Sequence, residues 1–167
     1  MITVYHGSNL VVKVPLVGIG RKNLDFGNGF YVTALSSQAE EWAANRARYY
    51  MLREGTVSQY EFDFDAAVAT FRYHKFEAYD RDWLHFIVDN RQGGDLWRQW
   101  DIIEGGVANN RVIDTVENYI ADLIDEETAL GLLSQHRPNH QICIVKQEVA
   151  DKYLRFTDSY QVEAYVE

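Results

Sequence analysis

The sequence predicts an α+β protein with a mostly antiparallel β-sheet core and helices packed around it. Short apolar segments rich in β-branched residues are interspersed with segments in which apolar residues recur at helical spacing. These segments do not follow the regular strand–helix–strand order of a parallel sheet. With 167 residues, 47% of them hydrophobic, and with no linker or repeat, residues 1–167 are expected to form a single domain.

Strands are predicted first at residues 2–5 and 30–33, which are short and apolar and are separated by a loop at 9–23. Residues 57–63 alternate between apolar and polar side chains, which is typical of a strand with one buried face. The remaining predicted strands are 71–77, 100–105, 141–145, and one or two within 153–165.

Helices are predicted where a capping residue precedes apolar residues at helical spacing. Ser37 is expected to cap a helix over residues 37–53, and Glu40, three residues later, to complete a capping box. The other predicted helices begin after the capping residues Asp80 and Asn109 or Asn110, and a last one covers 126–135.

Charge and cysteine content narrow the class of protein. The net charge of −9 and the pI of about 5.0 oppose long-range attraction to nucleic acid or to an anionic membrane. No apolar run approaches the roughly 18 residues of a membrane span. The one cysteine, Cys143, excludes a disulfide within the chain, and no histidine or cysteine spacing is typical of a metal site. We therefore expect a soluble, cytoplasmic protein without a metal or a membrane partner.

Two short motifs stand out near the start of the chain, YHGS at 5–8 and LDFGNGFYVT at 24–33. His6 ends the first predicted strand and is followed by Gly7, whose lack of a side chain lets a ligand reach the backbone. In the second motif, two glycines predict a tight turn that sets Tyr31 at the edge of the next strand. Each residue alone is more typical of a structural role, whereas the pair together indicates a nucleotide site. Neither a Walker A loop nor a complete dinucleotide-binding fingerprint is present in the sequence.

The motifs YHGS and FGNGFYVT, followed by SSQAEEWA, resemble the NAD-binding core of ADP-ribosyltransferases of the diphtheria-toxin and poly(ADP-ribose) polymerase type. The chain is also similar to a bacterial family of unknown function that is thought to share this fold. This second resemblance takes in GRKNLDFGNGFYVT, WDIIEGGVANNRV and NHQICIV, and therefore most of the chain. The resemblance implies an ADP-ribosyltransferase-like fold with a split, mostly antiparallel sheet, and NAD as the substrate.

The resemblance also assigns roles to individual residues. It implies that His6 bonds a ribose hydroxyl of NAD, that Gly7 holds the nicotinamide carboxamide through its backbone, and that Tyr31 stacks on the nicotinamide ring. Gln141 takes the third catalytic position, where the family usually has glutamate; an amide keeps the hydrogen bond but loses the negative charge. Arg21 is expected to meet the pyrophosphate, with a solvated loop charge as the equal alternative. Ser8, Gly29 and Phe30 complete the expected NAD-binding residues.

The expected function is NAD-dependent mono-ADP-ribosyl transfer to an acceptor whose nature the sequence does not indicate. Such an enzyme would fit the toxic member of a bacterial toxin–antitoxin or effector–immunity pair, with an antitoxin or immunity protein as its partner. Because Gln141 replaces a glutamate, a catalytically weak or inactive module that binds NAD or ADP-ribose is the first alternative. An NAD glycohydrolase, in which water replaces the acceptor, is the second.

Other polar residues have competing interpretations. His140, next to the third catalytic position, is expected to orient the acceptor. Asp101 and the pair Asn109–Asn110 fit a ligand-facing loop, although helix capping explains the asparagines slightly better. Asp63 and Asp65 would share one face of a strand as a carboxylate pair, but they flank an expected strand end, which argues against an active pair.

Overall fold

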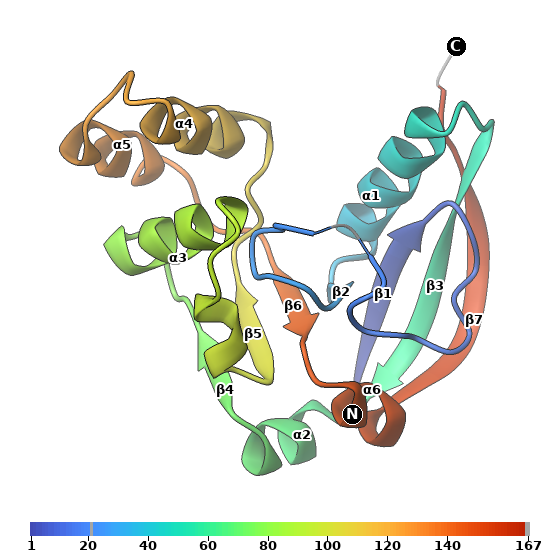
Figure 1. The fold of residues 1–167 in the computed structure, drawn as a ribbon. Helices are drawn as coiled ribbons and strands as arrows, with labels where there is room; N and C mark the ends of the chain where they lie inside the picture. The colour runs from blue at the N-terminus through green and yellow to red at the C-terminus, as the bar shows by residue number, and fades with distance from the viewer. Residues whose placement is uncertain (21, 166–167) are drawn as a thin grey trace.

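The protein forms two β-sheets, and the computed structural model describes residues 1–20 and 22–165. The first sheet is antiparallel and has the order β1-β3-β7 (Figure 1). The second has the order β2-β6-β5-β4, in which only the β4–β5 pair is parallel. The strands are β1 (Ile2–Ser8), β2 (Phe30–Val32), β3 (Glu54–Phe62), β4 (Tyr73–Lys75), β5 (Ile102–Gly105), β6 (Gln141–Ile144) and β7 (Leu154–Glu163).

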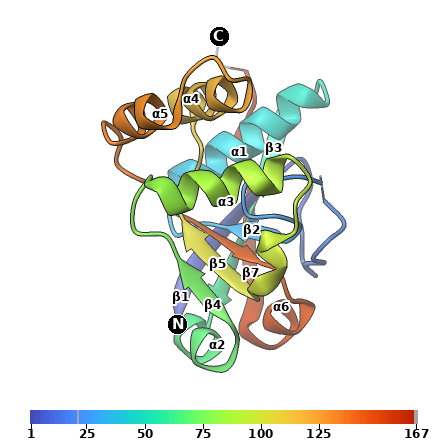
Figure 2. The same ribbon diagram turned by 60° about the vertical axis from the view of Figure 1, so that its left-hand side comes forward.

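Six α-helices surround the sheets within the described residues, so the predicted α+β class is confirmed. Helix α1 packs on the first sheet, while α3, α4 and α5 lie on the side of the second sheet that faces away from the first (Figure 1). Helices α2 and α6 lie together near the start of β1 in both views (Figures 1 and 2). The helices are α1 (Ser36–Tyr49), α2 (Phe64–Thr70), α3 (Arg81–Arg91), α4 (Asn110–Ile120), α5 (Glu126–Leu133) and α6 (Gln147–Tyr153), with a short 3-10 helix η1 at Leu96–Gln99.

A single bridge between Tyr5 and Thr33 connects β1 to the chain just after β2. The Tyr5 N–H donates to the Thr33 carbonyl oxygen at 2.8 Å, and the Thr33 N–H donates to the Tyr5 carbonyl oxygen at 2.9 Å. The bridge is isolated, so β1 and β2 separate on both sides of it. Among the described residues, the edge of the first sheet therefore meets the edge of the second at this one bridge.

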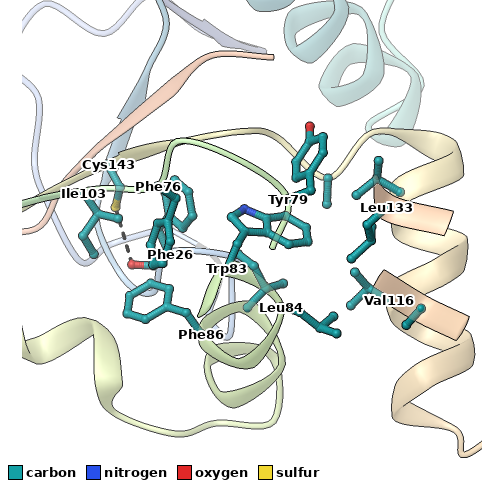
Figure 3. Close-up of a cluster of buried hydrophobic side chains, with 14 residues drawn as sticks. Phe26, Phe76, Tyr79, Trp83, Leu84, Phe86, Ile103, Val116, Leu133 and Cys143 are labelled. Atoms are coloured by element: carbon teal, nitrogen blue, oxygen red, sulfur yellow. Dashed lines mark hydrogen bonds between the residues drawn. The ribbon is translucent and has the colours of Figure 1, made fainter. Parts of the chain in front are cut away.

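The second sheet has two buried faces with different neighbours. The face that carries Phe30, Val32 and Ile142 packs against the first sheet, and we call it the inter-sheet face. The opposite face, which carries Tyr31 and Cys143, packs against helices and is the helix-facing face. Figure 3 shows the cluster on the helix-facing side, which includes Phe26, Phe76, Tyr79, Trp83, Leu84, Phe86, Ile103, Val116 and Leu133.

The start of α1 differs from the prediction. The helix begins at Ser36, its N-cap residue is Leu35, and no side chain caps it, so the predicted capping box of Ser37 and Glu40 is wrong. Instead, the Thr33 hydroxyl oxygen accepts a hydrogen bond from the Leu35 N–H at 3.1 Å. Thr33, which forms the bridge between the sheets, thus also stabilises the turn into α1. A sequence pattern within the helix cannot indicate this contact.

The chain after β3 also differs from the prediction. β3 ends at Phe62, Asp63 is the N-cap residue of α2, and Asp65 lies in the first turn of that helix. The two aspartates therefore do not share a strand face, which agrees with the argument against an active carboxylate pair. Helices α2 and α6 and the 3-10 helix were not predicted, because at 7, 7 and 4 residues they are too short to show helical periodicity.

Candidate functional site

His6 of β1 and Tyr31 of β2 meet where the two sheets join. The His6 Nδ1 lies 2.6 Å from the Tyr31 carbonyl oxygen, and because a carbonyl only accepts, Nδ1 carries the proton. Burial lowers the pKa of His6 from 6.5 to about 4, against the raising effect of this hydrogen bond. The ring is therefore neutral near pH 7, and its other nitrogen, Nε2, presents a lone pair.

The His6 ring lies on the inter-sheet side of β2. It stacks on Phe30, with ring centroids 4.2 Å apart and planes inclined by 26°. Because neighbouring residues of a strand point to opposite faces, the Tyr31 ring lies on the helix-facing face. The structure thus brings His6 to the backbone of Tyr31 and places the two rings on opposite sides of β2.

Gly7 lies two residues beyond the bridge on β1. Backbone N–H and C=O groups alternate in direction along a strand, so those of Gly7 point the same way as those of Tyr5, away from β3. A Cβ atom at Gly7 would lie 2.0 Å from the carbonyl oxygen of Ala39 in α1, so only glycine lets the helix pack this closely. The backbone groups of Gly7 point in a direction that would allow a ligand contact. The close packing of α1, however, is by itself enough to require glycine at this position.

The Tyr31 side chain holds the glycine-rich loop against the second sheet. Its hydroxyl donates to the Gly27 carbonyl oxygen at 2.7 Å and accepts from the Phe26 N–H at 3.1 Å. Burial, together with the neighbouring Cys143, raises the pKa of Tyr31 above its ordinary value, so the hydroxyl keeps its proton. A Cβ atom at Gly29 would lie 2.4 Å from the Cys143 Sγ, so this glycine is also required by packing. Both residues therefore have structural roles in the loop.

Gln141, the third predicted catalytic residue, shares the helix-facing face with Tyr31. It lies two residues before Cys143 on β6, and Cys143 pairs with Tyr31 across the ladder. Gln141 is 4% exposed, and its Nε2 donates to the Gly106 carbonyl oxygen at 3.3 Å. The structure therefore places Tyr31 and Gln141 on one face of the second sheet and the His6 ring on the other.

The remaining predicted NAD-binding residues are described only in part. Ser8 ends β1, and its hydroxyl donates to the Asn9 side-chain oxygen at 3.2 Å. Arg21 lies outside the described residues, so the expected contact with the pyrophosphate has no structural description. Gly29 packs against β6, and Phe30 stacks on the His6 ring.

The residues around β5 that were expected to face a ligand have structural partners. The Asn109 Oδ1 accepts from the Val112 N–H at 3.4 Å and caps α4, which confirms the capping alternative. Asp101 accepts from the Arg72 backbone N–H at 2.9 Å and from the Arg72 guanidinium at 3.0 Å. Burial would raise the pKa of Asp101, but the hydrogen bonds from Arg72 outweigh this and lower it. Asp101 therefore anchors the chain before β5 and does not face a loop that binds a ligand.

A second group of polar side chains lies at the end of β5. Glu104 is 8% exposed, and its carboxylate accepts hydrogen bonds from the Tyr73 hydroxyl and from the His140 Nε2 at 3.1 Å. The His140 Nδ1 accepts from the Ala34 N–H at 3.2 Å, so Nε2 carries the ring proton. Burial would raise the pKa of Glu104, but the hydrogen bonds from His140 and Tyr73 hold it below its ordinary value of 4.5. The carboxylate is therefore ionised near pH 7.

Two cavities lie away from His6 and Tyr31. One, of about 260 Å³, is beside the Glu104 cluster, and its lining includes Glu104, Gly106, Asn139 and His140. The other, of about 410 Å³, lies between the start of α3 and the end of α5. The smaller cavity adjoins Gln141, because its lining residue Gly106 accepts the hydrogen bond from the Gln141 amide.

Sequence reasoning missed Glu104 and Tyr73. Glu104 follows two isoleucines in a segment predicted as a buried strand, and a glutamate is almost never buried unless it is paired. A glutamate in a segment predicted to be buried was therefore the feature of the sequence that could have indicated this cluster. The partners could not be named, because Tyr73 and His140 are 31 and 36 residues away and meet Glu104 only through the order of the strands.

Comparison with known proteins assigns the chain to a family. Residues 2–156 match the model of a family described as a protein of unknown function, DUF3990. The chain belongs to this family. Neither the curated proteins nor the solved structures that were compared give a match. Membership of a family of unknown function is thus confirmed, and the relationship to ADP-ribosyltransferases stays a prediction.

Two further properties bear on the class of protein. Within residues 1–20 and 22–165, every helix is too short or too polar to cross a membrane. In the same part of the chain, no three side chains of histidine, cysteine, aspartate or glutamate are grouped so that they could hold a metal ion.

Proposed function

We propose that this protein is an NAD-dependent mono-ADP-ribosyltransferase. The observation that carries the proposal is the 2.6 Å contact between the His6 Nδ1 and the Tyr31 carbonyl oxygen. It joins, beside the isolated bridge between the sheets, the two motifs in which the chain resembles NAD-binding ADP-ribosyltransferases. The glycines of both motifs are also in close contact with other elements, so the local geometry depends on the motif residues themselves.

The chemistry suits a site with few charges. The bond between the nicotinamide nitrogen and C1′ of the ribose breaks, and nicotinamide leaves as a neutral molecule with the bonding electrons. The acceptor nucleophile then bonds to C1′ and loses a proton, so the protein mainly has to hold NAD and position the acceptor. A neutral His6 with a lone pair on Nε2 can accept a hydrogen bond from a ribose hydroxyl, and Gly7 has backbone groups directed away from β3.

A second candidate function is a non-catalytic module that binds NAD or ADP-ribose. Gln141 favours it, because its amide is neutral, almost fully buried and already bonded to the Gly106 carbonyl oxygen. An uncharged group at this position stabilises a positive charge on the ribose less well than a carboxylate does. Gln141→Glu would restore the charge, so under the first proposal this substitution preserves or raises NAD cleavage.

Incubation of the protein with NAD labelled on the adenosine side and a cell lysate tests the proposal. Label on a macromolecule supports transfer, and digestion with protease or nuclease then identifies the class of acceptor. Binding of NAD without turnover supports the non-catalytic module, and release of free ADP-ribose alone supports an NAD glycohydrolase. Absence of NAD binding rejects the transferase and the glycohydrolase, and absence of ADP-ribose binding as well rejects the module.

His6→Ala and Tyr5→Phe form a matched pair for the same assay. Their side chains lie on opposite faces of β1, and the Tyr5 ring packs toward α1. Loss of the His6 hydrogen bond to the ribose should lower turnover by roughly tenfold or more, whereas Tyr5→Phe should change it little. Equal effects of the two substitutions on NAD cleavage would contradict the assigned role of His6.

The proposal extends to a toxin with a neutralising antitoxin or immunity protein as its partner. Expression of the active chain in a bacterium should then arrest growth, and the His6→Ala variant should not. Undisturbed growth, with the wild-type chain present in soluble form and cleaving NAD, would reject the toxin role and leave the transferase activity standing.

A further inference from the structure

Glu104 is a buried carboxylate whose charge is not balanced by its hydrogen-bond donors. The Tyr73 hydroxyl is neutral, and the His140 ring is also neutral, because its Nδ1 accepts from the Ala34 N–H. A buried charge is costly unless it is paired. Two neutral donors orient the Glu104 carboxylate and leave one negative charge beside the cavity at the end of β5.

The charge of Lys75, at the rim of the cavity, favours the ionised Glu104 carboxylate but does not cancel its charge. Lys75 lines the cavity, but its Nζ pairs with the Glu77 carboxylate at 3.8 Å, and both side chains are largely exposed. The pair therefore contributes no net charge. The lining as a whole carries one uncompensated carboxylate, that of Glu104.

The carboxylate has room for a further donor. Each carboxylate oxygen has two lone-pair sites, and each Glu104 oxygen uses one of them, for Tyr73 and for His140. The cavity measures about 260 Å³, which is below the roughly 300–1,000 Å³ of pockets for drug-sized molecules. It therefore suits a group of the size of one side chain and not a whole dinucleotide.

We propose that this cavity is a binding site for a guanidinium or ammonium group, with the Glu104 carboxylate as its anchor. A planar guanidinium offers paired N–H donors that match a carboxylate, and its charge balances that of Glu104. Tyr73 and His140 act as positioning residues, because they orient the carboxylate without carrying charge themselves.

The site also adjoins Gln141, one of the residues of the proposed reaction. Gly106 lines the cavity and accepts the hydrogen bond from Gln141, and His140 precedes Gln141 in the chain. A cationic side chain held by Glu104 is thus placed as the acceptor of ADP-ribose. This role as acceptor site rests on the proposed function, whereas the binding of the cation does not.

The test is a titration of the full chain, without NAD, with methylguanidinium and with methylurea, followed by NMR chemical shifts of the backbone. The two probes have nearly the same shape and differ in charge. We expect saturable binding of methylguanidinium with shifts at Gly105, Gly106 and His140, and affinity for methylurea that is weaker by about tenfold or more. Glu104→Gln should reduce the affinity for methylguanidinium to that for methylurea, and the control Glu148→Gln, at an exposed pair with Lys152 that does not line the cavity, should change it less than about twofold.

Equal affinity for both probes, no saturable binding, or full binding by a folded Glu104→Gln variant would overturn the proposal. If Glu104→Gln does not fold, the comparison of the two probes on the wild-type chain still decides the matter. Because no NAD is present, a chain that binds methylguanidinium but does not cleave NAD keeps the site and rejects the transferase. A chain that cleaves NAD but binds both probes equally rejects the site alone.

Discussion

The junction between β1 and β2 and the cluster at the end of β5 each contain a partly buried histidine, but the surroundings of the two histidines differ. His6 donates to a backbone carbonyl oxygen and stacks on Phe30, and burial, with a smaller effect of the Arg46 charge, lowers its pKa to about 4. His140 instead donates to the ionised Glu104 carboxylate. The junction therefore suits a neutral sugar hydroxyl, and the cluster suits a cation.

The two regions also differ in the interactions that stabilise them. The junction is held by close packing, because glycines at positions 7 and 29 let α1 and β6 approach within contact distance. The cluster is held by hydrogen bonds to one charge, from side chains of β4 and of the segment before β6. Changes at the junction should thus act through packing and burial, and changes at the cluster through charge.

The largest expected effect is that of Tyr31→Ala at the junction. Truncation of this partly buried ring should lower the free energy of unfolding by about 3–5 kcal/mol, as for other aromatic core residues. Tyr31→Phe keeps the ring but leaves the Phe26 N–H without its acceptor, so we expect a smaller loss of about 1–3 kcal/mol. Urea unfolding followed by tryptophan fluorescence measures both. A fully stable Tyr31→Ala variant would mean that the ring does not hold the loop.

The second expected effect is a pH dependence of stability that is caused by His6 at the junction. The pKa of His6 is about 4 in the folded chain against an ordinary 6.5, so the unfolded chain binds the proton first as the pH falls. Stability that is complete above pH 6.5 should be lost progressively down to about pH 4, by about 3 kcal/mol in total. His6→Gln lacks this titration, so the difference between the two unfolding curves isolates it. Parallel pH dependence of both proteins would contradict a neutral His6 in the folded chain.

Glu104→Gln should have a somewhat smaller effect in a different pH range. At pH 7 the loss of charge-assisted hydrogen bonds from Tyr73 and His140 should cost about 1.5–3 kcal/mol of unfolding free energy. The folded pKa of Glu104 lies below 4.5, so this contribution is present above pH 4.5 and disappears as the pH falls below it. Urea midpoints of wild type and variant should therefore converge only in acid. Convergence already near pH 6 would show that the carboxylate is not held ionised.

The smallest effect compares the helix that follows each region. Asn109→Ala removes the side-chain cap of α4, next to the cluster, and should cost about 1 kcal/mol. Ser37→Ala in α1, next to the junction, removes no cap and should change the unfolding free energy by less than about 0.5 kcal/mol. Thermal unfolding of both variants measures the difference. A larger loss for Ser37→Ala would mean that α1 is capped after all.

Local patterns account for the parts of the fold that were predicted correctly. The alternation before Phe62, the apolar segment after His140 and the capping residue Asp80 each act within one element, so the sequence alone located β3, β6 and the start of α3. The capping box failed for the opposite reason. The start of α1 is set by Thr33, whose backbone is fixed by Tyr5 from another strand.

For the candidate site, too, some features follow from the sequence and others only from the tertiary structure. The sequence by itself determined the α+β class, membership of the DUF3990 family and the neighbouring motifs around His6 and Tyr31, because these depend on residues close together in the chain. Only the tertiary structure decided that the rings of His6 and Tyr31 face opposite sides of β2. It alone brought Tyr73 and His140 to Glu104, because strand order and face depend on how apolar surfaces are buried over the whole chain.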